Sequence, residues 1–144
     1  MVEIREVGWQ EAGDELSAIR STVFIIEQHV PAALEWDGLD QEARHLLAVD
    51  EAGHAVGCAR VLAGGAIGRM AVLRKWRRRG VGTKLLKAAV ALCIARQWHE
   101  ITLSAQDHAI PFYEKAGFEV CSETYLDAGI PHRDMRLTRK PVNP

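Results

Sequence analysis

The sequence predicts an α/β (α+β) fold in which helices flank a mixed, mostly antiparallel sheet of about six to seven strands. One observation is the chain of 144 residues, 48% hydrophobic and 26% charged, which has the size and composition of one globular domain. Another is periodicity, because stretches with the two-residue period of strands lie between stretches with a helical period. No repeat, linker or low-complexity segment interrupts the chain, so we expect a single domain over residues 1–144.

The first third of the chain predicts a strand, a long helix and a loop. Val2–Val7 alternates apolar and polar residues, which is the strand period. Apolar residues on one helical face then predict a helix from about Glu11 to Glu27. These residues are Leu16, Ile19, Val23 and Phe24. The acidic segment Val30–Glu42 loses the pattern and contains Pro31, so we expect a loop there with room for a short turn of helix.

Three antiparallel strands are expected next, because turn residues separate three apolar stretches. The strands are Arg44–Asp50, Ala55–Ala63 and Ile67–Leu73. Asp50–Gly53 has the turn chemistry of a hairpin, and Gly64–Gly65 makes the second turn.

The second half predicts two helices and three strands. The first helix runs from just after Arg79 to near Gln97, with Val81, Leu85, Ala88, Ala89 and Leu92 on its apolar face. A helix over His108–Ala116 is expected to have Asp107 as its N-cap and Gly117 as the left-handed residue that ends it. The expected strands are Glu100–Ser104, Phe118–Tyr125 and Arg133–Thr138.

Charge is distributed unevenly along the chain. Seven of the 18 Lys and Arg residues lie between Arg74 and Lys87, a window with no Asp or Glu, while the other 11 face all 19 acids, a balance of −8. One local basic patch on an otherwise acidic chain suits a small polyanion better than a long nucleic acid. The four Trp residues are scattered and form no stacking platform, so we expect no nucleic-acid partner.

Several other classes of protein are not indicated. The chain has no apolar run near 18 residues and no secretory signal, so we expect a cytoplasmic protein without a membrane partner. Cys58, Cys93 and Cys121 are odd in number and far apart, which favours small buried thiols over a disulfide or zinc site. The six His residues form no HxH or HExxH pattern, so no metal is expected.

The segment Met70–Thr83 carries the strongest chemical signal, because a strand runs into a basic loop that opens a helix. The unpaired N–H groups of a helix's first turn and its dipole bind phosphate. Gly80 and Gly82 let an anion approach the backbone, and Arg77, Arg78 and Arg79 add positive charge. The alternative is a solvated basic turn. The Walker spacing is absent, and Leu85 stands where GxGxxG needs its third glycine.

Two motifs resemble those of the GNAT acetyltransferase superfamily. Arg77-x-x-Gly80-x-Gly82 is similar to its Arg/Gln-x-x-Gly-x-Gly/Ala loop, and Ala109–Phe118 is similar to its FYxxxGF helix-to-strand junction. The resemblance covers nearly the whole chain, since the order of elements also fits. A bacterial subgroup of uncharacterised members, of the YjcF and ElaA kind, is resembled at Val23–Gln28, Glu35–Asp40, His45, Gly68–Arg69, Ala105–Gln106 and Gly129–His132.

The resemblance implies a GNAT fold whose central strands splay apart to admit acetyl-CoA. Those strands are Ile67–Leu73 and Glu100–Ser104. Backbone groups of the first strand would hold the pantetheine arm, and the loop before the helix would hold the pyrophosphate. The residues expected to bind acetyl-CoA are Met70, Ala71, Val72, Arg77, Arg78, Arg79, Gly80, Val81, Gly82, Thr83, Gln106 and Phe112. A free amine would attack the thioester directly.

The resemblance also implies two proton transfers. Tyr113 is the expected acid for the departing thiolate, although it also suits a core position beside Phe112 and Phe118. Glu27 is the first candidate for the base that collects the proton of the amine. The others, which we also expect near the acceptor, are Glu35, Asp37, His45 and His132. Each of these also suits a solvated or structural role, and the acidic loop would attract a cationic amine.

These observations favour an enzyme that moves an acetyl group from acetyl-CoA to a primary amine of a small molecule or peptide. One alternative is a catalytically silent CoA sensor or scaffold of the same fold. Another is a basic patch that binds a protein or an RNA surface. A homodimer is a further expectation, since dimers are common in the superfamily.

Overall fold

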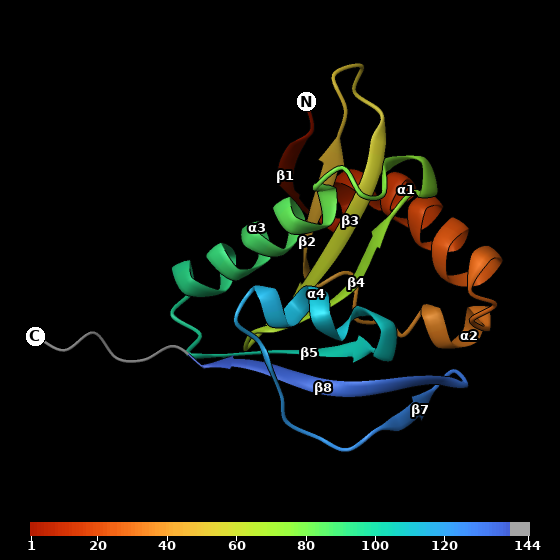
Figure 1. Cartoon of the computed structure of the whole chain (residues 1–144). Coiled ribbons are helices and arrows are strands. Elements are labelled where there is room, and N and C mark those ends of the chain that lie inside the picture. The colour runs from red at the N-terminus through yellow and green to blue at the C-terminus, as the bar shows by residue number, and fades with distance from the viewer. Residues whose placement is uncertain (139–144) are drawn as a thin grey trace, which may run out of the picture.

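One mixed sheet contains all the strands of the computed structural model, which describes residues 1–138 (Figure 1). The order is β1-β2-β3-β4-β5-β8-β6, with β7 also paired to β8, and only the β4–β5 pair is parallel. The strands are β1 Glu3–Val7, β2 Arg44–Val49, β3 Ala55–Leu62, β4 Ala66–Val72, β5 Glu100–Gln106, β6 Glu119–Val120, β7 Tyr125–Asp127 and β8 Ile130–Thr138. This arrangement confirms the predicted fold class.

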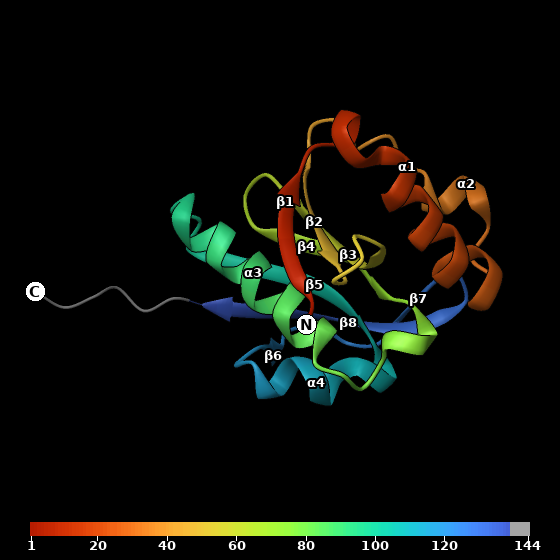
Figure 2. The same cartoon turned by 90° about the horizontal axis from the view of Figure 1, so that it is seen from above.

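Helices cover both faces of the sheet, with α1 and α2 on one side and α3 and α4 on the other (Figure 2). The helices are α1 Trp9–Arg20, α2 Ala32–Glu35, α3 Val81–Ala95 and α4 Ile110–Lys115, with a π-helix η1 at Ser21–Glu27 and 3-10 turns η2 at Arg74–Trp76 and η3 at Asp107–Ala109. The apolar face of α3 packs on the sheet through residues such as Val81, Leu85 and Ala89. Leu16 and Ile19 of α1 do the same on the opposite face. No helix among residues 1–138 is long and apolar enough to cross a membrane.

Strands β4 and β5 separate soon after they begin. Their register contains only the pairs Ala66–Thr102 and Ile67–Leu103. A register shift between β3 and β4 near Arg60 accompanies this separation, and Arg69 on β4 adopts a left-handed φ of 48°. Such a bulge bends and twists the strand that carries it. The rest of β4 therefore leaves β5, and the predicted splay is confirmed.

The structure corrects several predicted boundaries. The single strand predicted over Phe118–Tyr125 is two short ones, β6 and β7, because the chain between them turns so that Ser122 Oγ accepts the Asp134 N–H at 2.8 Å. Asp107 is not an N-cap, since the segment enters α4 through the 3-10 turn η3 with no side-chain cap. Gly117 has the predicted left-handed conformation, with φ 96°. Cys58 and Cys93 are buried, whereas Cys121 is exposed, contrary to expectation.

A buried ion network holds the segment between α1 and β2. Arg20, at the end of α1 and 1% exposed, donates to Glu35 Oε2 and Asp40 Oδ1, both at 2.7 Å. Arg60 on β3 donates to Asp40 Oδ1 at 3.1 Å and to both carboxylate oxygens of Asp37, at 2.9 and 2.8 Å. Glu35 and Asp40 are themselves buried. The predicted acidic loop is therefore folded onto arginines of the regular elements, which supply the partners that buried charges require.

We expect Arg20→Ala to be strongly destabilising, because it leaves two buried carboxylates without their shared partner. Removing one member of a buried ion pair costs about 3–5 kcal/mol of unfolding free energy. The matched control is Arg5→Ala, since Arg5 is exposed and its ion-pair partner within residues 1–138 is the exposed Glu3; it should change stability by about 0.5 kcal/mol or less. Urea unfolding of the three proteins measures both effects. Equal losses would show that the network is dispensable.

Candidate active site

The N-terminus of α3 has the geometry of an anion-binding end. Gly80 is its N-cap with a left-handed φ of 81°, and the first intrahelical bond runs from the Lys84 N–H to the Gly80 carbonyl at 3.1 Å. The N–H groups of residues 81–83 therefore have no carbonyl acceptor within the helix. Gly82 faces the Phe112 ring, which would lie 3.5 Å from a Cβ atom. Fixed N–H donors and the helix dipole make this end suitable for a phosphate.

Arg77 and Glu27 pair with one another beside this end. The guanidinium donates to the two Glu27 oxygens at 2.6 and 2.8 Å, and its Nε donates to the Val72 carbonyl at 2.8 Å. These bonds join η1, the end of β4 and the basic loop. Hydrogen bonds from Arg77 lower the pKa of Glu27, which makes that carboxylate a weaker proton acceptor. Arg78 and Arg79 remain exposed, with the Arg79 guanidinium over the Trp76 ring.

A cleft of about 530 Å³ lies where β4 and β5 separate. Its walls come from η1, α2, β4, β5, α4 and the β7–β8 hairpin. Six of the predicted site residues line it together, namely Glu35, Asp37, Met70, Gln106, Tyr113 and His132. The Gln106 Nε2 donates to Gln28 Oε1 at 2.9 Å, so that the end of β5 is bonded to the segment after η1. The sequence therefore predicted much of this lining.

His45 does not belong to the cleft, contrary to expectation. Its side chain is buried, Nε2 lies 2.9 Å from the Asp40 carbonyl, and the ring contacts Trp9. Burial lowers the pKa of this imidazole. The reason for its position is that β2 is an inner strand covered on both faces, so no residue of it reaches the acceptor space.

The acidic loop lines the cleft but is neutralised by arginines. Asp37 also accepts from Arg69 Nη2 at 3.2 Å, and Arg69 Nε lies 3.1 Å from Glu35. Three carboxylates therefore face three arginines, which removes the net charge expected to attract a cationic amine. The pairing of the loop with these arginines was not predicted, since Arg20 and Arg60 belong to no motif and Arg69 was noted only as part of a resemblance.

Tyr113 occupies a mostly apolar position on the α4 side of the cleft. Its ring contacts Phe112 and Phe118 edge-on, at centroid distances of 5.1 and 6.2 Å. Burial raises the pKa of the phenol to about 12. The hydroxyl is therefore protonated at neutral pH, as a general acid must be, while the ring serves the core.

His132 on β8 lies against a hydroxyl cluster that the sequence did not reveal. The Tyr125 ring stacks on the imidazole, at a centroid distance of 6.1 Å and an interplanar angle of 19°. The Tyr125 hydroxyl also contacts Ser104 Oγ and donates to Asp134 Oδ1 at 2.5 Å. Pairing of β8 with both β5 and β7 creates this cluster, so it could not be predicted without knowing the sheet register.

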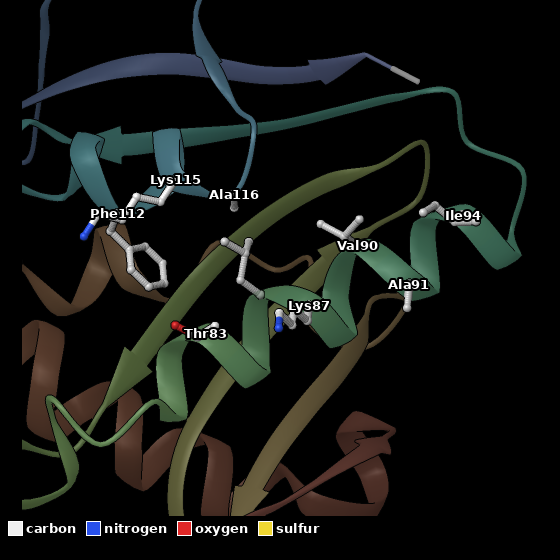
Figure 3. A pocket seen from close by; sticks show the side chains of 9 residues that line it. Thr83, Lys87, Val90, Ala91, Ile94, Phe112, Lys115 and Ala116 are labelled. Atoms are coloured by element: carbon white, nitrogen blue, oxygen red, sulfur yellow. The ribbon is translucent and has the colours of Figure 1, made fainter. Parts of the chain in front are cut away.

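A second groove, of about 370 Å³, runs between α3 and α4 and begins at the anion-binding end (Figure 3). Thr83, Lys87 and Val90 line it from α3, while Phe112 and Lys115 face them from α4. Its walls are mainly apolar, with lysine amines at two positions. It suits a flat, mostly apolar group that carries negative charge.

Comparison with known proteins agrees with this geometry. Residues 7–139 match the acetyltransferase (GNAT) domain family. The uncharacterised N-acetyltransferase YjcF of Bacillus subtilis is 40% identical over 120 residues, 81% of this chain and 86% of YjcF. A solved acyl-CoA N-acyltransferase of Pseudomonas aeruginosa is 30% identical, with TM-score 0.82 over 96% of this chain and all of that one. ElaA of Escherichia coli is 29% identical, with TM-score 0.85 over 95% and 99% of the two chains.

Acid should weaken the protein through Asp37. Hydrogen bonds from Arg60 lower the pKa of this carboxyl from 3.8 to about 2 in the folded state. Its contribution to stability is therefore complete above about pH 4 and is lost as pH falls toward about 2. Asp37→Asn should lower stability at neutral pH, by at most about 2 kcal/mol, and should flatten the decline in acid. Urea unfolding from pH 2 to 7 tests this, and identical slopes for both proteins would contradict it.

Proposed function

Because the chain belongs to the GNAT acetyltransferase family, we propose that it transfers an acetyl group from acetyl-CoA to a primary amine by direct attack. The observation that carries the proposal is the separation of β4 from β5 beside the open N-terminus of α3. A strand edge without a partner offers N–H and C=O groups to an extended ligand. The helix end offers donors for its phosphates.

The helix end, the β4 edge and the groove between α3 and α4 would each suit one part of acetyl-CoA. The pyrophosphate would accept from the N–H groups of residues 81–83, with Arg78 and Arg79 nearby. The amides of the pantetheine arm would pair with the β4 edge at residues 70–72. The adenosine end suits the groove between α3 and α4, where Lys87 and Lys115 would face its phosphate (Figure 3). The thioester then reaches the cleft that Tyr113 lines.

In this proposal Tyr113 gives its proton to the departing sulfur. The phenol stays protonated until the carbon–sulfur bond breaks, since its pKa is raised to about 12. The low-polarity surroundings also raise the basicity of a thiolate formed there, which favours the transfer. Phe112 and Phe118 contact the ring edge-on and shield those sides of it from water.

The acceptor would enter the polar part of the same cleft. There Gln28, Gln106 and Ser104 offer hydrogen-bonding groups, and Asp37 and Arg69 offer one charge of each sign. A small amine or the N-terminus of a peptide fits a site of this size. The neutralised acidic loop argues for recognition by hydrogen bonds rather than by a general attraction of positive charge.

Gly82→Glu should abolish binding of acetyl-CoA, because it places a carboxylate where a phosphate would accept from N–H groups. Gly82→Ala is the matched control, since a Cβ atom there meets only the Phe112 ring at ordinary contact distance. At about 100 times its Kd, acetyl-CoA should stabilise the wild type by about 2.7 kcal/mol. Melting curves with and without acetyl-CoA measure the shift. A full shift in Gly82→Glu would remove this loop from the binding site.

Tyr113→Phe should lower kcat by roughly 10²–10⁴-fold, the usual contribution of a positioned acid. The ring and its contacts remain, so the melting temperature and the shift produced by acetyl-CoA should be unchanged. The measurement is turnover at saturating acetyl-CoA with an amine that the wild type accepts. Wild-type turnover in the folded variant would return Tyr113 to a purely structural role. Binding of acetyl-CoA without turnover of any amine would instead favour a CoA sensor.

A further inference from the structure

His132 is held in one tautomer and one orientation. Its Nδ1 lies 2.7 Å from the Ile130 carbonyl, and a carbonyl oxygen only accepts, so Nδ1 carries the proton. Nε2 therefore keeps its lone pair, and it has no hydrogen-bond partner among residues 1–138. The side chain is 9% exposed, stacks on Tyr125 and lines the cleft. These are the features of an imidazole prepared to accept a proton.

The carboxylates considered as bases, Glu27 beside the cleft and Glu35 and Asp37 in its lining, are less suited to that task. Glu27 gives both oxygens to Arg77. Asp37 accepts from Arg60 through both oxygens, and Glu35 is buried against Arg20. Each would have to give up a cation before it could take a proton. His132 would lose no hydrogen bond on taking a proton, because the proton adds to Nε2 while Nδ1 stays bonded to the Ile130 carbonyl.

The register of the sheet puts His132 and Tyr113 on opposite faces of the sheet. His132 stands directly opposite Gln106 on β5, so both side chains share one face. Leu103 and Ala105 belong to the other face, whose core Tyr113 joins from α4. Both residues nevertheless line the cleft that opens between β4 and β5. An acceptor on one face would thus meet a thioester that Tyr113 contacts from the other.

Resting on the proposed function, we infer that His132 is the general base that deprotonates the acceptor amine. An alkylammonium acceptor gives one proton to Nε2, and the freed lone pair forms the carbon–nitrogen bond to the acetyl group. The carbon–sulfur bond breaks, and its electron pair leaves with sulfur, which takes the proton of Tyr113. The second proton lost by nitrogen replaces that of Tyr113. The imidazolium releases its proton to solvent.

Charged and titratable groups from several elements line the same cleft as the imidazole or lie beside it, and each will shape the pH profile. From β7 and β8 they are Tyr125, Asp127 and Asp134, and from the other walls of the cleft Glu35, Asp37, Arg69, His108 and Tyr113. A pH profile alone therefore does not identify the base, so the decisive comparison changes the acceptor instead.

The test compares His132→Asn with wild type on two acceptors. The Asn amide can still donate to the Ile130 carbonyl, but it offers no basic nitrogen. An alkylamine, which is protonated at pH 7, should lose roughly 10²–10⁴-fold in kcat/KM. An alkoxyamine is already neutral at pH 7 and should lose only a few-fold. His99→Asn, an exposed position away from the cleft, should leave both rates unchanged.

A second readout does not depend on turnover. Nitrogen chemical shifts of the free protein should show His132 as the Nδ1–H tautomer. The His132 signal is assigned as the one that disappears in His132→Asn. An Nε2–H tautomer would overturn the inference, as would equal losses with both acceptors or a loss confined to His108→Asn. If His132→Asn acetylates the alkylamine as fast as the wild type does, this inference is overturned while the proposed function stands. A wild type that binds acetyl-CoA but acetylates no amine overturns the proposed function, and this inference with it.

Discussion

The buried ion network around Arg20 is the constraint on which the rest of the site depends. The large apolar side chains of residues 31–43, which are Leu34, Trp36 and Leu39, remain exposed, so hydrophobic burial contributes little to holding this segment on the sheet. Arg20 and Arg60 hold the segment instead, because their buried guanidiniums need carboxylates as partners and the buried Glu35 and Asp40 need cations. The loop is thereby held against β3, and it forms one wall of the cleft.

The same network extends to the opening of the sheet. Arg69 lies on β4 where the strand leaves β5, in a left-handed conformation that its bonds to the carbonyls of Leu34 and Glu35 help to maintain. The Glu27–Arg77 pair plays a similar role at the other end of β4. Both ends of the diverging strand are therefore fastened to the helical layer. The gap between β4 and β5 is a consequence of these contacts as well as of the bulge.

Ion pairing determines which polar residues of the cleft stabilise its walls and which remain free for chemistry. Its carboxylates and arginines largely satisfy one another, which stabilises the walls but removes them from proton transfer. In the proposed mechanism, proton transfer is carried out by two groups that make no ion pair within residues 1–138, the phenol of Tyr113 and the imidazole of His132. In the same way, with Arg77 engaged, the proposed phosphate binding would depend mainly on backbone N–H groups and on the two exposed arginines, Arg78 and Arg79.

The sequence by itself determined the elements with a strong period and the loop that we propose to bind the pyrophosphate. The helix after Gly80, the strand before it and the Tyr113 junction were all predicted, because each depends on neighbours within one turn or one strand. Tertiary structure alone decided which charges meet. Arg20 and Asp40, or Ser104 and Tyr125, are far apart in the chain, and only strand register and burial bring them together. For this reason His45, expected at the acceptor, lies in the interior, whereas His132 acquired a carbonyl partner and a free nitrogen.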